Sequence, residues 1–177
     1  QYPAVALYYY CYQALTAADP EPNFLQLKDR LFHYADAFPQ PEMRDLLLLA
    51  INYCIKRINA NEHRYLEEAL ELYRLGLEEG ILLENNRLSR FTFNNTVGIA
   101  IRLQAYEWTE TFLDTFSPYL HPDDRDMTYH LGYARLEFAR EHYQQALTHL
   151  QKADYRDLIH HMVAKTLQMK TYYELGE

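Results

Sequence analysis

The sequence predicts an all-α protein built from antiparallel helix pairs, and two observations lead to this fold class. Apolar residues recur with the period of an α-helix along nearly the whole chain, and Pro, Asn or Gly interrupts the pattern at short intervals. The 177 residues include only 5 Gly and 7 Pro. Because sheet proteins need many tight turns, this scarcity of turn residues favours long helices, and we expect no β-sheet.

Helix boundaries follow from residues that stop or cap a helix. The segment Asp19-Pro20-Glu21-Pro22 ends the first helix, because the residue before a Pro is pushed out of the α region. Pro41 suits a first helical turn, Gly80 is a predicted C-cap and Ser89 is a predicted N-cap. The expected helices, about nine in number, cover residues 2–16, 23–38, 42–58, 62–79, 89–103, 107–116, 123–140, 143–153 and 156–175.

These helices are expected to form pairs within a single domain, residues 1–177. Short loops place consecutive helices antiparallel, which gives pairs at 2–38, 42–79, 89–118 and 123–153 and a lone helix at 156–175. No shift in composition and no low-complexity linker divides the chain. The sequence begins at Gln1 without Met, already inside a helical pattern, so we expect a fragment of a longer chain, and an upstream targeting signal stays open.

A short internal pattern points to a repeat architecture. Tyr143, Ala146, Leu150 and Ala153 have the spacing Y-x2-A-x3-L-x2-A, which resembles the second helix of a tetratricopeptide (TPR) repeat. Trp108 and Tyr143 begin two second helices and lie 35 positions apart, close to the TPR period of about 34 residues. The match is specific over 123–153 and loose elsewhere. This resemblance implies a TPR-like fold, a right-handed α-α superhelix (solenoid).

The same pattern makes packing predictions for the seventh and eighth helices. Small Ala side chains let two paired helices approach closely, so Ala146 and Ala153 should be buried where these helices meet. Leu131-Gly132 and Ala134 supply the matching small residues on the seventh helix.

Two further segments resemble a second group of proteins. Residues 93–98, with the sequence Phe-Asn-Asn-Thr-Val-Gly, precede a Trp, and the chain ends near a Tyr-Tyr-Glu-Leu segment. In these segments the chain is similar to uncharacterised bacterial helical-repeat proteins. This resemblance implies a fold and no activity.

Charge and hydropathy argue against two classes of partner. The chain has 17 Lys+Arg against 25 Asp+Glu, a formal net charge of -8, whereas a duplex-binding domain needs a basic face to neutralise phosphates. No run of about 18 apolar residues is present, so we expect no membrane-spanning helix. We therefore expect a cytoplasmic protein that binds neither nucleic acid nor membrane.

No motif points to catalysis, a metal or a cofactor. The chain has no G-x-S-x-G, no Walker loop and no dinucleotide fingerprint. His142 and His149 lie two turns apart on one helix face, and no His-Glu-x-x-His pattern occurs, so the eight His are interpreted as structural. Cys11 and Cys54 sit in apolar stretches, which favours buried reduced thiols over a disulfide or a metal pair. We expect no enzyme, no metal and no cofactor.

Tyrosine and asparagine leave alternatives open. The chain has 17 Tyr, and those at positions 8, 9, 10 and 12 surround the first helix. Most Tyr are expected to fill grooves between helices, and the alternative is an aromatic binding surface. Asn94 and Asn95 lie mid-helix, where Asn has poor propensity, and Asn52 is a similar case. Either a buried hydrogen-bond network or contact with a ligand would compensate for this cost.

The leading functional hypothesis is a non-catalytic protein-protein interaction scaffold. In a helical-repeat fold, the first helices of the pairs line a concave groove that holds a peptide or protein segment. The TPR-like phase places Arg135, Lys165, Lys170 and Tyr173 near that groove, and Asn95 is a further candidate. Two alternatives stay open: a structural or sensor segment of a larger multidomain protein, and an α-helical enzyme with a deep pocket of shifted titratable groups.

The helix at 156–175 carries apolar residues on more than one face. One stripe should pack on the seventh and eighth helices, and another would ordinarily be covered by a following helix, which this sequence lacks. Each large apolar side chain left in water forgoes roughly 1.5–3 kcal/mol of burial. We therefore expect a second copy, as a homo-oligomer, or a longer natural C-terminus to cover this surface.

Overall fold

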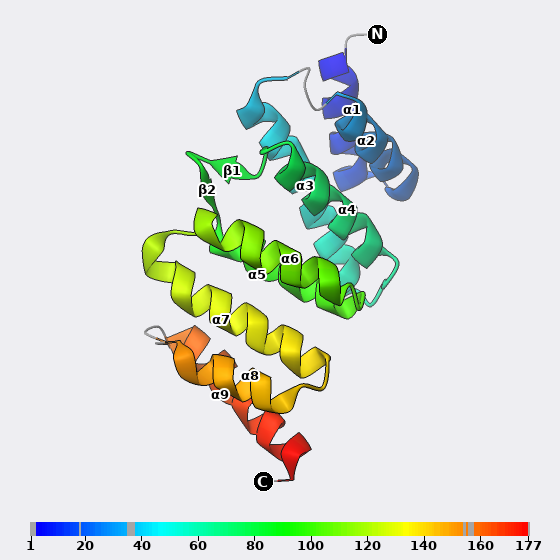
Figure 1. The fold of residues 1–177 in the computed structure, drawn as a ribbon. Helices are drawn as coiled ribbons and strands as arrows, with labels where there is room; N and C mark the ends of the chain where they lie inside the picture. The colour runs from blue at the N-terminus through cyan, green and yellow to red at the C-terminus, as the bar shows by residue number, and fades with distance from the viewer. Residues whose placement is uncertain (1–2, 18, 35–37, 154, 156–157, 177) are drawn as a thin grey trace. The chain divides into compact units, whose positions relative to one another are not determined.

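The computed structural model describes residues 3–17, 19–34, 38–153, 155 and 158–176 (Figure 1). Within these ranges the chain forms nine α-helices, one short 3-10 helix and two very short strands, so the predicted all-α class is confirmed. The chain groups into two compact units, residues 1–84 and 85–177, and each unit is described by itself. The right-handed superhelix and the single domain stay predictions.

The first unit consists of four helices. They are α1 (Pro3–Thr16), α2 (Glu21–His33), α3 (Gln40–Asn59) and α4 (Tyr65–Glu78). Helix α1 packs on α2, α3 packs on α4, and α3 also contacts α1 and α2. The core holds Phe24 stacked on Tyr53 at 4.7 Å between ring centroids, with Tyr65 edge-on to both rings. These rings join the two helix pairs of the unit by apolar burial and aromatic contact.

Three helix boundaries in this unit test the predicted breakers. Pro41 lies in the first turn of α3, as expected. Gly80 has φ +67°, a left-handed conformation that Gly adopts without steric cost, and it follows the end of α4 as the predicted cap. The predicted helix 23–38 is wrong at both ends. Helix α2 begins at Glu21, because Pro22 is tolerated in a first turn, and it ends at His33, which leaves Phe38 outside.

The prediction of no β-sheet is wrong at one place. Strands β1 (Leu83–Glu84) and β2 (Arg87–Leu88) form a two-stranded sheet. Asn85 and Asn86 between them have φ of +50° and +58°. Asn tolerates this left-handed region better than most residues, and two such residues make the tight turn that suits a hairpin.

The second unit consists of five helices and a 3-10 turn. They are α5 (Arg90–Arg102), α6 (Tyr106–Phe116), η1 (Ser117–Tyr119), α7 (Pro122–Ala139), α8 (Tyr143–Lys152) and α9 (Leu158–Leu175). Ser89 caps α5 as predicted, since its Oγ accepts a hydrogen bond from the Phe91 backbone N–H at 3.2 Å. Helix α5 pairs with α6 and α7 pairs with α8, while α7 also packs against α5, α6 and α9.

The packing predictions for α7 and α8 hold in part. Ala146 is fully buried and Leu150 is nearly so, as expected for the contact between paired helices. Ala153 is only half-buried, because α8 ends at Lys152 and Ala153 is already extended with ψ 142°. Gly132 does not face α8. A Cβ built on it would lie 2.5 Å from Leu113 Cδ2, so this Gly allows close approach of α7 to α6.

In the described ranges, no helix is long and apolar enough to cross a membrane.

Candidate binding surface on α9

Helix α9 exposes a broad apolar surface, as the sequence predicts. Its large apolar side chains that face solvent are Leu158, Ile159, Met162, Val163, Met169 and Tyr173. Met162 is 60% exposed and Tyr173 is 80% exposed. Scattered exposed apolar residues are ordinary on a protein surface, but a contiguous group of this kind marks an interaction site or an uncovered interface.

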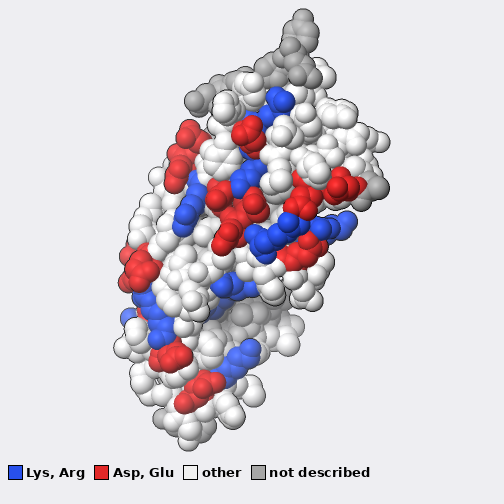
Figure 2. Space-filling model, turned by 90° about the vertical axis from the view of Figure 1, so that its right-hand side faces the viewer, with Lys and Arg blue, Asp and Glu red and all other residues white. Residues whose placement is uncertain are grey.

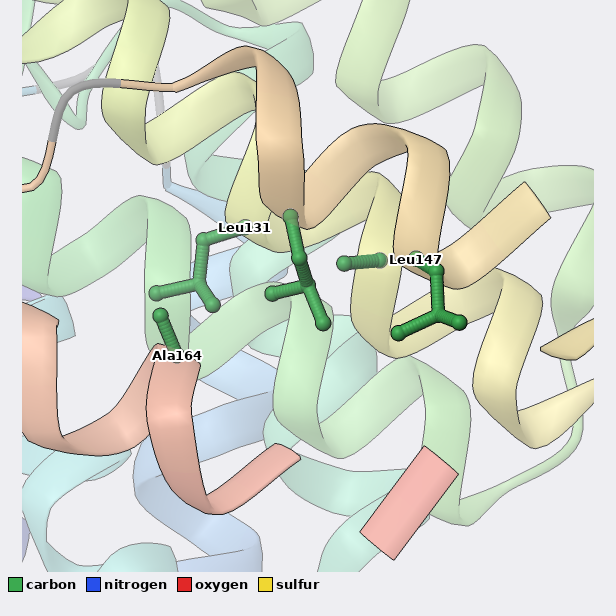
Figure 3. Close-up of a cluster of buried hydrophobic side chains, with 5 residues drawn as sticks. Leu131, Leu147 and Ala164 are labelled. Carbon is green, nitrogen blue, oxygen red and sulfur yellow. The ribbon is translucent and has the colours of Figure 1, made fainter. Parts of the chain in front are cut away.

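The opposite face of α9 is anchored in the core of the second unit. Ala164 of α9, Leu131 of α7 and Leu147 of α8 belong to one buried apolar cluster, in which Ala164 lies beside Leu131 (Figure 3). Ala134 and Leu150 complete this buried cluster. Because the cluster holds α9 against two helices, the apolar side chains on the other face are presented from a fixed support.

Three of these exposed side chains, Ile159, Met162 and Val163, line a hollow of about 490 Å³ beside α7. We call it the α7–α9 hollow. Two charged residues line it, Arg135 from α7 and Lys170 from α9. The remaining lining comes from α9 and consists of Ile159, Met162, Val163, Thr166 and Leu167. The arrangement therefore combines an apolar floor with two cationic groups, and no Asp or Glu lines it in the part of the chain that is described.

Arg135 has an unusual environment for a charged group. A Cβ built on Gly98 of α5 would lie 2.9 Å from the Nη2 atom of Arg135, so the Arg135 guanidinium lies against the α5 backbone. Burial lowers the pKa of Arg135, and no carboxylate among the described residues offsets this effect. Arg stays protonated in proteins, so the hollow contains a half-buried positive charge without a counter-charge in this part of the chain.

The predicted binding residues divide into two groups. Arg135 and Lys170 lie together in the α7–α9 hollow. Lys165 points elsewhere on α9, where its Nζ donates a hydrogen bond to Gln168 Oε1 at 3.1 Å. Tyr173 and Asn95 are both exposed, and neither lines the hollow.

Of the two alternatives for the mid-helix asparagines, a hydrogen-bond network is not seen at Asn94 Oδ1 among the described residues. The Asn94 side chain is half-buried, and its Oδ1 atom is buried without a hydrogen-bond partner among the described residues. Asn95 is exposed. Asn52 is exposed as well and lines a separate hollow of the first unit, between α1 and α3. Ligand contact therefore stays open for all three positions.

A second apolar surface lies on α1 of the first unit. Val5, Tyr8, Tyr9, Tyr12 and Leu15 are all more than half exposed. The expectation that most Tyr fill grooves between helices is therefore wrong for this helix, because the described core of the unit contacts the face that carries Leu7, Cys11 and Ala14.

Sequence reasoning missed a histidine pair in the second unit. His130 of α7 and His149 of α8 approach with 3.0 Å between their Nδ1 atoms, so one ring donates a hydrogen bond to the other. Tyr133 stacks on His149 with ring centroids 4.9 Å apart, and its hydroxyl donates to Asp114 at 2.8 Å. No sequence signal pairs His130 with His149, because the contact depends on how α7 and α8 pack.

Both cysteines of the chain lie among the described residues. Cys11 and Cys54 are buried free thiols, as predicted, and burial raises the pKa of Cys54 to about 12. A thiol of that kind is protonated and inert at neutral pH. Among the residues described, no three His, Cys, Asp or Glu side chains are grouped so that they could hold a metal ion.

Charged side chains of both signs are mixed on the molecular surface. Figure 2 shows acidic and basic side chains next to each other on the face that it draws. Several form ion pairs between helices, including Arg64 with Glu21 at 2.5 Å and Arg140 with Glu110 at 2.7 Å. Arg135, by contrast, has no carboxylate partner in the described part of the chain.

Comparisons of the chain with protein-family models, curated proteins and solved structures find no match. The TPR-like resemblance accordingly stays an expectation drawn from residues 123–153.

Proposed function

We propose that this chain is a non-catalytic interaction module that binds a protein or peptide segment in the α7–α9 hollow. The observation that carries the proposal is the exposed apolar face of α9, held on a rigid core and open along a hollow of about 490 Å³. Burying several large apolar side chains under a partner contributes roughly 1.5–3 kcal/mol for each one fully covered. An exposed surface of this kind is typical of helix-in-groove recognition.

The chemistry of the hollow favours binding over catalysis. Its lining offers hydrocarbon, one hydroxyl and two cations, and among the described residues it contains no carboxylate, thiol or imidazole that would act as a base or nucleophile. The Thr166 hydroxyl already donates to the Met162 carbonyl at 2.8 Å.

A displayed-peptide selection tests the proposal with two matched variants. Met162 and Met169 are both exposed on α9, but only Met162 lines the hollow. We expect peptides selected on the parent protein to lose at least about tenfold in affinity for Met162→Asp, since a charge in the apolar floor is costly to bury. The Met169→Asp variant should bind them nearly as the parent does.

Circular dichroism establishes that both variants keep their helices before binding is measured. If selection yields no peptide that distinguishes Met162→Asp from Met169→Asp, the hollow is not the binding site and the proposal fails.

A further inference from the structure

The unpaired guanidinium of Arg135 indicates the chemistry of the missing partner. Buried charges in proteins are normally paired, because removing an isolated ion from water is energetically unfavourable. Arg135 is half-buried and has no ion-pair partner among the described residues, although the chain carries 25 Asp+Glu. A carboxylate supplied from outside would remove this penalty and make a charge-assisted hydrogen bond.

Lys170 extends the positive character of the same site. Lys170 lies in the α7–α9 hollow with Arg135, and Lys170 is exposed whereas Arg135 is half-buried. A partner with carboxylates on both sides of an apolar stripe would meet both groups, whereas a basic partner would bring like charges together.

The shape of the apolar lining indicates the form of the partner. Ile159, Met162, Val163, Thr166 and Lys170 follow the spacing i, i+3, i+4, i+7 and i+11 on α9. These positions form one continuous face of the helix. Side chains in such a row make ridges and grooves that fit those of another helix.

We propose that the α7–α9 hollow binds an acidic amphipathic helix of a partner protein. The apolar side chains of that helix would pack on α9, and its carboxylates would pair with Arg135 and Lys170. This inference rests on the proposed function and specifies its ligand. Gly98 is a positioning residue for the site, because the absence of a Cβ lets the guanidinium lie against α5.

The test uses two labelled helical peptides of about 16 residues that share one leucine face. One peptide carries Glu at the positions flanking that face, and its twin carries Lys. Fluorescence anisotropy measures the affinity of each for the 177-residue chain. We expect the Glu peptide to bind at least about tenfold more tightly than the Lys peptide.

Four variants locate the source of this preference. Arg135→Gln should remove most of the ratio between the two peptides, and Lys170→Gln, at an exposed position that leaves the fold intact, should reduce it. Gly98→Ala keeps the charge but displaces the guanidinium, so it should also reduce the ratio. Lys165→Gln removes a lysine of the same helix outside the hollow and should leave the ratio unchanged.

The outcomes separate this inference from the proposed function. Equal binding of the Glu and Lys peptides, both abolished by Met162→Asp, overturns the acidic partner and leaves a binding module with another preference. Failure of both peptides, together with selected peptides that ignore Met162→Asp, overturns both proposals. Self-association of the chain that the Met162→Asp variant removes identifies a second copy as the occupant instead. Binding to the 177-residue chain but not to a longer natural form shows that the chain's own helix fills the hollow.

Discussion

His130 and His149 are two imidazoles that must share one proton between their Nδ1 atoms, 3.0 Å apart. Burial lowers the pKa of both, and His130 and Lys152 lower the pKa of His149 further, while Asp126 and Glu137 act in the opposite direction. Both rings are therefore held neutral in the folded protein more strongly than in the unfolded chain, where the pKa is about 6.5.

This pair predicts a loss of stability in mild acid. Because the folded pKa values are lowered, the unfolded chain binds more protons, and stability is fully present above about pH 6.5 and falls as the pH drops below it. We expect the free energy of unfolding, measured with urea, to fall less between pH 7.5 and pH 5.5 in the His130→Gln/His149→Gln double variant than in the parent. His161→Gln, at an exposed position, controls for the removal of a histidine. An identical pH dependence in the parent and the double variant would contradict the prediction.

At the scale of the elements, α8 is a short helix held by one buried stripe. Ala146, Leu147 and Leu150 are its described buried residues, and Ala146 is fully buried. A small side chain at this position sets how closely the two helices approach. Leu147 and Leu150 of the same stripe belong to the buried cluster that α8 shares with α7 and α9.

Enlarging this side chain should separate the helices. Ala146→Leu is expected to lower the free energy of unfolding by roughly 1–3 kcal/mol, because a packed core cannot accept three extra carbon atoms without strain. Gln145→Leu adds an apolar side chain at the exposed neighbouring position and should change stability little. Both values come from urea unfolding followed by circular dichroism. Equal midpoints for the parent and Ala146→Leu would show that this contact is loosely packed.

At the scale of the whole molecule, residues 85–177 form one of two compact units, with a buried apolar cluster shared by α7, α8 and α9. Leu113, Leu120, Leu131 and Leu136 of this unit are nearly or fully buried in the folded chain. We expect residues 85–177 to stay helical and to unfold cooperatively when expressed alone, because a compact unit with its own core can fold independently. Leu131→Asp in the same segment should abolish that transition, since it buries an unpaired charge.

Circular dichroism and thermal unfolding measure both proteins. An isolated 85–177 segment without helical signal would show that this unit depends on residues 1–84 for its fold.

Much of the helical content was accessible from the sequence because its signals are local. The helical apolar period, Pro41 in a first turn, Ser89 as an N-cap and Gly80 after α4 each act within one or two turns of the chain. The errors are local as well. Helix α2 ends at His33, earlier than its apolar pattern predicts. The strands on either side of Asn85 and Asn86 have two residues each, which is too short to produce a periodic pattern.

The sequence by itself determined that the chain is helical, where most helices begin and end, and that α9 carries more apolar surface than one packed face needs. Only the tertiary structure decided which side chains meet. Arg135 and Lys170 line one hollow, and Lys165 does not. His130 contacts His149, and the guanidinium of Arg135 lies against Gly98. The physical reason is that helix propensity and capping depend on neighbours in sequence. The charge, burial and partners of a side chain instead depend on how separate helices pack and which way each helix is rotated.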